Sequence, residues 1–414
     1  MADRKLSETL RERGYAYQFS SETLEEIADS PKTLYWGVDP SADSMHIGQL
    51  MGMLVVRRFI EAGHRVIFLA GGATGMIGDP GGKNEERPLL DLETIRKNVA
   101  GIEAQAKRLL DVENIEFVNN AEWLGTIGLL EFLRDTGKYE TVNAMIKRET
   151  VAKRIEDPEQ SISYAEFTYM LLQAHDFWHL FTQRDVTLQV GASDQWGNII
   201  SGVDLIRHKE GKTAYAFTWP LLINKATGKK FGKSEGGALW LDAAKTSPYE
   251  LYQYLLNSED DAVEEYLLKL TLLPLDAIRD VMAKHAEAPE ERIAQQRLAE
   301  EVTTLVHGEG ALATAKRISE ALFAEELSDD EWQALTEAPK AAVALGTALV
   351  DALVGIGLAS SKREAREFIQ NGAITLTGRR IADTTHILAA SDFSPAGLAI
   401  LKRGKRQARV IEAA

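Results

Sequence analysis

Short apolar runs alternate with longer amphipathic stretches through the first half of the chain, and this alternation predicts strands that take turns with helices. Each apolar run is brief and β-prone, which is typical of a buried strand. The five expected strands cover residues 34–38, 64–70, 115–118, 187–191 and 215–218. Helical spacing covers 91–110 and most of 128–183. The pattern favours an α/β fold: a Rossmann-like doubly wound parallel sheet with a helical insertion at about 120–186.

The second half of the chain has a different pattern. Residues 248–323 are rich in Leu, Ala and Glu and predict helices, whereas residues 324–340 are acidic and contain Pro339. Residues 357–380 predict a helix followed by a hairpin. We therefore expect a Rossmann-like catalytic domain over 1–242, an α-helical domain over 243–325, a linker over 326–344 and a small α+β domain over 345–414.

Charge is distributed unevenly along the chain. The 62 acidic and 47 basic side chains give a formal net charge of −15, which argues against binding of nucleic acid by bulk charge. Residues 345–414 nevertheless carry ten Lys/Arg against six Asp/Glu. An acidic body with a basic tail favours an RNA contact at the tail, the alternative being a solvated cluster of charges.

Several classes of site and location are excluded by composition. The chain has no cysteine, so neither a disulfide nor a thiolate zinc site is expected. The first eight residues are charged and lack the apolar core of a signal peptide. The most apolar stretch, 341–361, is interrupted by Asp351 and three glycines, so we expect no membrane span and a cytoplasmic protein.

The stretch 34–49 joins the first expected strand to a helix. Asp39-Pro40 ends the strand, and Asp43 or Ser44 is expected to cap the helix that follows. His46 would then lie in the first helical turn, above the carboxyl end of a strand. Open α/β sheets bind anions at such places, because free N–H groups and the helix dipole face the ligand. The alternative is an ordinary strand–helix junction with a solvated histidine.

Polar side chains gather after other expected strands and on one helix. Asp79 ends a glycine-rich loop, where a carboxylate can bind a substrate ammonium or simply form a turn. Tyr169, Gln173 and Asp176 are spaced i, i+4 and i+7 among apolar neighbours. Polar groups in such surroundings need partners, which a ligand can supply, unless that helix face is solvated.

A second glycine-rich stretch, Gly228 to Gly237, carries three lysines. Lysines among glycines are typical of a mobile loop that can close on an anion, although most such loops are plain solvated turns. Asp194 and Gln195 follow another expected strand and open a helix, which adds hydrogen-bonding groups at the same edge of the sheet.

Together these motifs resemble one family. Residues 35–48, Tyr-x-Gly-x-Asp-Pro-x-Ala-Asp-Ser-x-His-x-Gly, resemble the tyrosyl branch of the class I aminoacyl-tRNA synthetases and their His-x-Gly-His signature. Residues 230–234, Lys-Phe-Gly-Lys-Ser, resemble that class's Lys-Met-Ser-Lys-Ser loop. Residues 294–308 resemble the family's helical domain, and residues 357–380 a small RNA-binding module shared with ribosomal protein S-four. The resemblance to bacterial tyrosyl-tRNA synthetases covers nearly the whole chain.

The resemblance implies a reaction and its partners. L-tyrosine and ATP would give tyrosyl adenylate and pyrophosphate, and the tyrosyl group would pass to the 3′ end of tRNA(Tyr). Mg²⁺ would arrive with ATP and bridge its phosphates, so neither a protein metal site nor a tightly bound cofactor is expected. A homodimer is implied as well.

The resemblance also implies roles for individual residues. Those acting on the phosphates are His46, Ser41, Lys230, Lys233, Ser234, Lys83 and Arg87. Those holding tyrosine are Tyr35, Asp79, Tyr169, Gln173 and Asp176. Those lining ATP and the adenylate are Gly37, Asp39, Gly48, Gln49, Gly191, Asp194, Gln195 and Lys233. Those contacting RNA are Lys362, Arg363, Arg366, Arg379 and Arg380.

Two positions depart from the family pattern. Gln49 replaces the second histidine of the signature, so it can donate to an anion but carries no positive charge. Trp36 stands where a small residue is usual, and its indole would either reshape the ribose pocket or point into the core.

Two other functions stay open. A tryptophanyl-tRNA synthetase could use Asp176 for the indole N–H, but Tyr35 would then lack a role, and that family lacks a tail like residues 345–414. The other alternative is a non-catalytic RNA-binding protein descended from a synthetase, or a synthetase with a second RNA role. A protein that only binds RNA would have no need of all five of the residues His46, Asp79, Asp194, Lys230 and Lys233.

Truncation after Lys340 is expected to spare formation of the adenylate but to impair charging of tRNA, because only the basic tail is removed. Exchange of labelled pyrophosphate into ATP measures the first step, and aminoacylation of tRNA the second. Equal loss of both activities would mean that the tail has a structural role.

Overall fold

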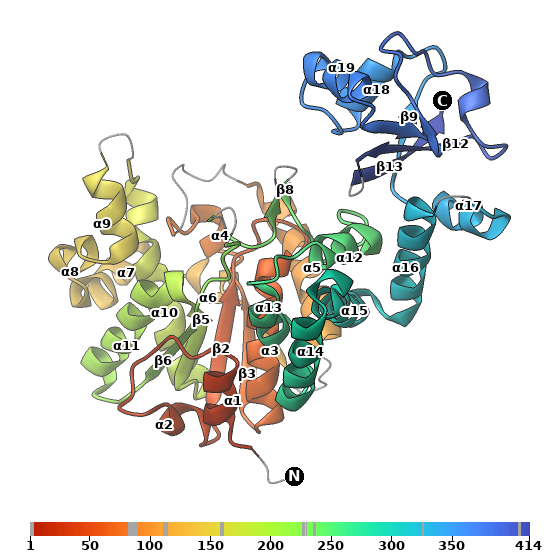
Figure 1. Ribbon diagram of the computed structural model, residues 1–414. Helices are drawn as coiled ribbons and strands as arrows, with labels where there is room; N and C mark the ends of the chain where they lie inside the picture. Colours follow the sequence, from red (N-terminus) through yellow and green to blue (C-terminus); the bar gives the residue numbers. More distant parts are fainter. Residues whose placement is uncertain are drawn as a thin grey trace. The chain divides into compact units, whose positions relative to one another are not determined.

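The computed structural model describes residues 4–81, 90–110, 115–157, 161–225, 228, 230–234, 237–324, 327–404 and 407–414, and of Glu149, Lys233 and Ser234 it describes the backbone only. The chain forms two compact units (Figure 1). The first comprises Met1–Lys245 and Ser258–Ala294, and the second comprises Thr246–Asn257 and Gln295–Ala414.

A six-stranded sheet forms the centre of the first unit, in the order β1-β6-β5-β2-β3-β4. Neighbouring strands are parallel except that β1 pairs antiparallel with β6. The strands are β1 (Gln18–Phe19), β2 (Thr33–Val38), β3 (Arg65–Ala70), β4 (Glu116–Asn119), β5 (Leu188–Ala192) and β6 (Tyr215–Trp219). The five expected strands are confirmed, whereas β1 was missed because two residues leave no periodic signal.

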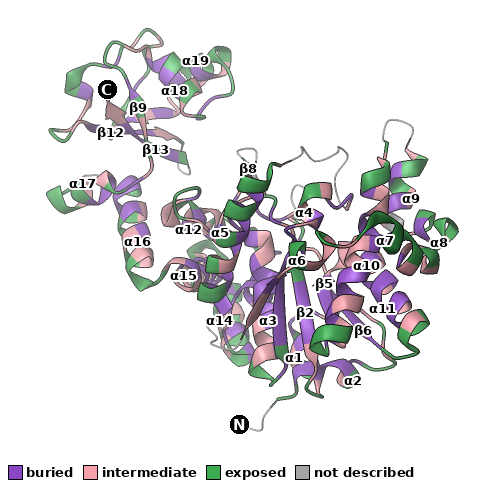
Figure 2. Cartoon of the chain, turned by 180° about the vertical axis from the view of Figure 1, so that it is seen from behind, coloured by how far each residue is buried: buried purple, intermediate pink, exposed green. Residues whose placement is uncertain are grey.

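Helices cover both faces of this sheet, as the alternation of buried strand residues requires. Tyr35, Ile67 and Leu69 share one face with α10 (Tyr164–Arg184) and α11 (Trp196–Glu210). Trp36 and Phe68 meet on the opposite face. On that face Phe59 of α3 (Ile47–Glu61) contacts Phe217 of β6. Strands β2, β3, β5 and β6 are accordingly almost wholly buried (Figure 2), and the doubly wound fold is confirmed.

The remaining helices of the first unit surround this core. Before and beside the sheet lie α1 (Leu6–Glu12), α2 (Leu24–Ala28), α4 (Thr74–Ile77) and α5 (Leu92–Leu110). The insertion between β4 and β5 contains α6 (Ala121–Leu124), α7 (Leu129–Asp135), α8 (Val142–Ile146), α9 (Glu149–Glu156) and α10. After β6 follow the short hairpin β7 (Lys233–Ser234) and β8 (Gly237–Ala238), then α13 (Val263–Leu270) and α14 (Leu275–Glu287). None of the helices in the described ranges has both the length and the apolar character of a membrane span.

The second unit combines helices with a five-stranded sheet of order β11-β10-β12-β13-β9. Its helices are α12 (Pro248–Leu256), α15 (Ile293–His307), α16 (Glu309–Phe323), α17 (Asp329–Thr336), α18 (Leu349–Gly355) and α19 (Lys362–Gln370). Its strands are β9 (Lys340–Val343), β10 (Ile374–Leu376), β11 (Arg379–Arg380), β12 (Leu398–Arg403) and β13 (Gln407–Ala413). Helices α13 and α14, expected in a separate helical domain, belong to the first unit.

The segment 326–344, expected to be a linker, contains ordered structure. Ser328 caps α17, and Leu335 of this helix packs with Ile400 and Val410 of the sheet. Strand β9 then pairs in parallel with β13. The acidic composition was misleading because the charges occupy one face of a short helix whose other face is apolar. A cut after Lys340 therefore passes through β9, and a cut after Ala324 removes α17 together with the sheet it covers.

Candidate active site

His46 forms the amino-terminal cap of α3. Its ring Nδ1 accepts a hydrogen bond from the Gly48 N–H at 3.1 Å, and the Gln49 side chain accepts from the His46 N–H at 3.0 Å. The expected caps have other partners: Ser44 donates to the Met45 carbonyl, and Asp43 pairs with Lys245. The cap prediction was therefore wrong, by three residues for Asp43 and by two for Ser44, because an imidazole nitrogen can accept as a capping oxygen does.

The lysine-rich loop packs directly on the His46 turn. A Cβ at Gly232 would lie 2.2 Å from Cγ2 of Ile47, so only glycine permits this approach. Backbone bonds complete the contact, since Ile47 donates to the Leu239 carbonyl at 2.8 Å and Leu241 donates to the Met45 carbonyl at 2.8 Å. The two motifs, far apart in sequence, thus form one structural element in the first unit.

The predicted phosphate-binding residues near this loop are described only in part. Lys230 donates to Asp194 at 2.9 Å, so its charge is paired with a carboxylate at the carboxyl end of β5. Phe231 is buried against Tyr266 of α13, with ring centroids 4.4 Å apart. Ser41 is exposed beyond the end of β2. The predicted Lys83 and Arg87 lie outside the described residues, as do the side chains of Lys233 and Ser234.

A buried carboxyl group, Asp176, lies at the base of the site. Its two oxygens accept hydrogen bonds from Nδ2 of Asn120 at 2.9 Å and from Nε1 of Trp123 at 2.7 Å. Burial raises the pKa of Asp176 to about 7, against the lowering effect of those two bonds. The carboxyl group is therefore poised between its neutral and ionised forms near neutral pH.

The Tyr35 hydroxyl is the second polar group at this base. Tyr35 is 1% exposed, and its hydroxyl has no hydrogen-bond partner among the residues that the structure describes. Burial, with the charge of Asp176 as a smaller cause, raises its pKa well above the ordinary value, so the hydroxyl keeps its proton. A buried, unpartnered hydroxyl costs free energy that a ligand's polar group can restore.

A second polar cluster surrounds Asp79. Gln195 donates to its Oδ2 at 2.5 Å, and the Gly81 N–H donates to its Oδ1 at 3.0 Å. Asn198 of α11 links the cluster, since it donates to Gln173 at 3.1 Å and lies 3.5 Å from Asp79. The structure therefore brings the predicted Asp79, Gln173 and Gln195 together.

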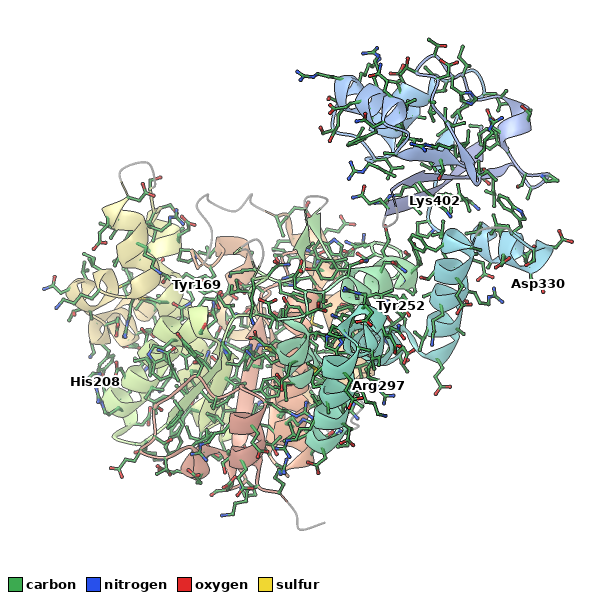
Figure 3. All side chains as sticks on the ribbon, in the orientation of Figure 1. Tyr169, His208, Tyr252, Arg297, Asp330 and Lys402 are labelled. Atoms are coloured by element: carbon green, nitrogen blue, oxygen red, sulfur yellow. The ribbon has the colours of Figure 1, made fainter. Side chains whose placement is uncertain are left out.

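Tyr169, labelled in Figure 3, belongs to a chain of hydrogen bonds that runs from Asp39 after β2 to the buried Asp176. Its hydroxyl donates to Asp39 at 2.8 Å, and Thr74 donates to the other oxygen of Asp39 at 2.8 Å. Asn120 in turn donates to Thr74 at 3.0 Å. Burial and then the charges of Asp39 and Asp79 raise the pKa of Tyr169 well above its ordinary value. Asp176 has a smaller effect in the same direction. Three carboxyl groups thus lie near one phenol, an arrangement suited to a cationic ligand.

Glycines allow the chain to approach this network closely. A Cβ at Gly71 would lie 2.2 Å from Oδ1 of Asp39, and one at Gly191 would lie 3.2 Å from Cβ of Gln195. Gly37 is exposed on β2 beside buried neighbours, and a Cβ there would lie 3.6 Å from Cδ2 of Leu69. Backbone here can therefore lie against a ligand.

Trp36 points into the core. It is 6% exposed and meets Phe68 and Trp219 edge to face. A Cβ at Gly52 of α3 would lie 2.9 Å from Cζ2 of Trp36 and 2.8 Å from Cζ2 of Trp219, so the indole occupies the space above that glycine. Of the two sequence alternatives for Trp36, the core position is the one observed.

Sequence reasoning missed four residues of the site: Thr74, Asn120, Trp123 and Asn198. Asn120 and Trp123 follow β4, so their place after a strand could have identified them. Thr74 opens α4 shortly after β3, so the same signal was present there, whereas Asn198 lies within α11 and gave no such signal.

The predicted RNA-contacting cations of the second unit fall into two groups. Lys362 pairs with Asp351 at 2.7 Å, Arg379 pairs with the buried Asp392 at 2.6 Å, and Arg380 donates to the Asn371 carbonyl at 3.1 Å. The other two, Arg363 and Arg366, are exposed on α19.

Two family descriptions together match most of the chain. The family of class I tRNA synthetases (W and Y) matches residues 28–324, and the tyrosine–tRNA ligase SYY-like C-terminal domain matches residues 331–411. The tyrosine–tRNA ligase of Staphylococcus carnosus is 47% identical over 97% of this chain and 98% of its own. That of Streptococcus mutans is 46% identical over the same shares. The crystal structure of a C-terminally truncated mitochondrial tyrosyl-tRNA synthetase from Aspergillus nidulans has a TM-score of 0.68 and 33% identity, covering 77% of this chain and 94% of that one.

Replacement of Asp176 by Asn should change how stability depends on pH. An unfolded aspartate releases its proton near pH 4, whereas the folded Asp176 holds it to about pH 7. Its contribution to the free energy of unfolding is therefore complete below about pH 4. It is lost progressively as pH rises from there through about 7, at up to about 1.4 kcal/mol per pH unit.

Asparagine does not titrate, so only the parent loses this stability as pH rises from 5 to 8. The difference in melting temperature between the parent and Asp176→Asn should therefore shrink by a few degrees over this range. Thermal unfolding without ligands measures this, with the exposed Asp280→Asn on α14 as the control. A constant difference in melting temperature would mean that Asp176 stays ionised throughout.

Proposed function

This chain belongs to the tyrosine–tRNA ligases within the class I tRNA synthetases, and from that premise we propose how its residues divide the reaction among them. The enzyme joins L-tyrosine to ATP, giving tyrosyl adenylate and pyrophosphate, and then transfers the tyrosyl group to the 3′ end of tRNA(Tyr). The observation that carries the assignment of the amino-acid site is the buried pair of Tyr35 and Asp176.

The phenol of tyrosine is assigned to that pair. A phenol donates one hydrogen bond and accepts another. Each oxygen of Asp176 already accepts one N–H and can accept a further bond, so the phenol would donate there. The unpartnered Tyr35 hydroxyl would donate to the phenol oxygen. Phenylalanine would leave the Tyr35 hydroxyl buried without a partner and would offer no donor to Asp176, which costs more than the loss of a contact; discrimination of this kind is already well known for this class of enzyme.

The ammonium of tyrosine is assigned to Asp79, Tyr169 and Gln173. The Tyr169 oxygen can accept a hydrogen bond from the ammonium while its own O–H continues to donate to Asp39. Asp79 supplies a buried carboxylate, and Gln173 an amide oxygen in the same cluster. Several carboxyl groups lie near this position, so their negative charge favours the binding of a cation.

The chemical step joins the two ends of the site. An oxygen of the tyrosine carboxylate attacks the α-phosphorus of ATP, and the bond to the bridging oxygen breaks as pyrophosphate leaves with the electron pair. We assign His46, Ser41, Lys230 and Lys233 to the negative charge that grows on the phosphates, a role of positioning and electrostatic stabilisation. Lys230 would exchange Asp194 for phosphate. Mg²⁺ would enter as part of the substrate, bridging the phosphates of ATP.

Transfer to tRNA follows at the same site. A hydroxyl of the terminal adenosine attacks the tyrosyl carbonyl, and AMP leaves. Within the second unit, the exposed Arg363 and Arg366 are the cations we assign first to the RNA backbone, because Lys362, Arg379 and Arg380 already have protein partners. We place the enzyme in the cytoplasm, where tRNA is used.

A homodimer is supported by an apolar surface on the insertion, formed by Leu129, Leu130, Leu133, Val142, Ile146 and Tyr164. Leu130 is 82% exposed and Tyr164 is 75% exposed. Leu133, Val142 and Tyr164 also line an open hollow of about 290 Å³. Large apolar patches on soluble chains mark association surfaces, and a second copy of the chain is the proposed partner.

Amino-acid-dependent exchange of labelled pyrophosphate into ATP, without tRNA, tests the function. We expect exchange with tyrosine and none with tryptophan or phenylalanine. Asp176→Asn should narrow the preference for tyrosine over phenylalanine by about tenfold or more, because one buried partner of the phenol is changed. Asp280→Asn is the control. Exchange with tryptophan alone would overturn the assignment of Tyr35, and unchanged selectivity in Asp176→Asn would remove that residue from the phenol site.

Sedimentation velocity tests the dimer. The parent chain should sediment as a dimer, and Leu130→Glu should shift it towards monomer, because a charge would be buried in the apolar interface. Leu92→Glu is the control: it places the same charge on another exposed leucine, outside this surface, and should leave the dimer intact. A monomeric parent, or dissociation by both variants alike, would contradict the assigned surface.

A further inference from the structure

The histidine and glutamine at the start of α3 hold each other in place. We propose that Gln49 is a positioning residue that fixes His46 as a neutral imidazole with its proton on Nε2. The inference rests on the proposed function, because it explains how Gln49 assists the phosphate chemistry through His46 and not by a charge of its own.

Reciprocal hydrogen bonds tie the two residues. The Gln49 amide oxygen accepts from the His46 backbone N–H at 3.0 Å, and the Gln49 backbone N–H donates to the His46 carbonyl at 2.8 Å. These bonds hold His46 in an extended conformation, with φ −109° and ψ 166°, from which its side chain turns back over the helix. Loss of the amide oxygen would free this turn.

The imidazole ring is confined on two sides. On one side it lies against the backbone of Gly48, where an added Cβ would come 2.9 Å from Cε1 of the ring. On the other side Trp240 meets it edge to face at 6.4 Å, and Trp240 is itself bridged to His46 through the backbone. The ring therefore has little freedom while the cap is intact.

The hydrogen bond from Gly48 selects the tautomer. Nδ1 of His46 accepts the Gly48 N–H at 3.1 Å, so it must present a lone pair. In a neutral imidazole the proton then resides on Nε2, which becomes the donor of the ring. A ring protonated at both nitrogens would set an N–H against an N–H and lose the cap. The structure thus gives His46 to a phosphate oxygen as a neutral hydrogen-bond donor.

Glutamine suits this task better than a second histidine would. An amide oxygen accepts at every pH, whereas an imidazole that takes up a proton can no longer accept. The departure from the His-x-Gly-His signature at Gln49 therefore keeps the cap, and with it the His46 tautomer, independent of protonation at position 49.

Nitrogen NMR on the chain labelled with ¹⁵N-histidine tests the inference directly. The sequence has eight histidines, and the His46 signals are those lost in His46→Asn. The parent should show His46 as a single tautomer with a protonated Nε2. Gln49→Glu retains an acceptor oxygen and should keep that signature. Gln49→Met, matched in length but without an oxygen, should show both tautomers. A parent-like signature in Gln49→Met would overturn the proposal.

Kinetics of adenylate formation supply the second readout. Gln49→Met should lower kcat by about tenfold while the KM for tyrosine stays within about twofold, because His46 acts only on the growing phosphate charge. A raised KM for tyrosine with unchanged kcat would contradict the positioning role. An active parent that shows both tautomers would overturn this inference alone, whereas a folded parent that forms no adenylate would overturn the proposed function.

Discussion

The site depends on the burial of one carboxyl group that is nevertheless supplied with hydrogen bonds. Asp176 lies on the buried face of α10, where removal of water favours its neutral form, and two donors from the segment after β4 oppose that preference. The carboxyl group is therefore an acceptor whose protonation a ligand can change. A phenol that donates a hydrogen bond to it favours the ionised form. A carboxylate exposed to water would bind every donor weakly, and one buried without donors would remain neutral.

The polar network is positioned by the reversal of strand order in the sheet. Strand β2 lies between β3 and β5, and the connections from β2 and towards β5 run on opposite faces. The chain therefore parts at the carboxyl ends of these strands, which is where open α/β sheets bind ligands. Asp39, Gly71 and Asp194 each follow one of the three strands, so their proximity is a property of topology before it is one of side-chain chemistry.

Sequence reasoning could predict most of this because the informative residues sit at strand ends. The five longer strands and the helix carrying Tyr169, Gln173 and Asp176 have strong periodic signals, and the structure gathers those side chains as expected. The hydrogen-bond partners of these side chains could not be predicted from the neighbouring sequence. Examples are Asn198, which joins Gln173 to Asp79, and His46, which caps its own helix. The acidic stretch 326–344 failed for a different reason, since its few apolar positions matter only against a sheet formed by residues far along the chain.

Gly52 and Trp36 constrain the order in which this sequence can change over evolution. The indole fills the space where any side chain on Gly52 would project. Exchange of Trp36 for a smaller residue leaves a cavity but no clash, so it is a permissive first step. The indole of Trp219 lies equally near, so a side chain at position 52 is accepted only after both indoles have been replaced, and restoring either indole would then be blocked. Lineages with small residues at both positions 36 and 219 should therefore be the ones in which position 52 is free to vary.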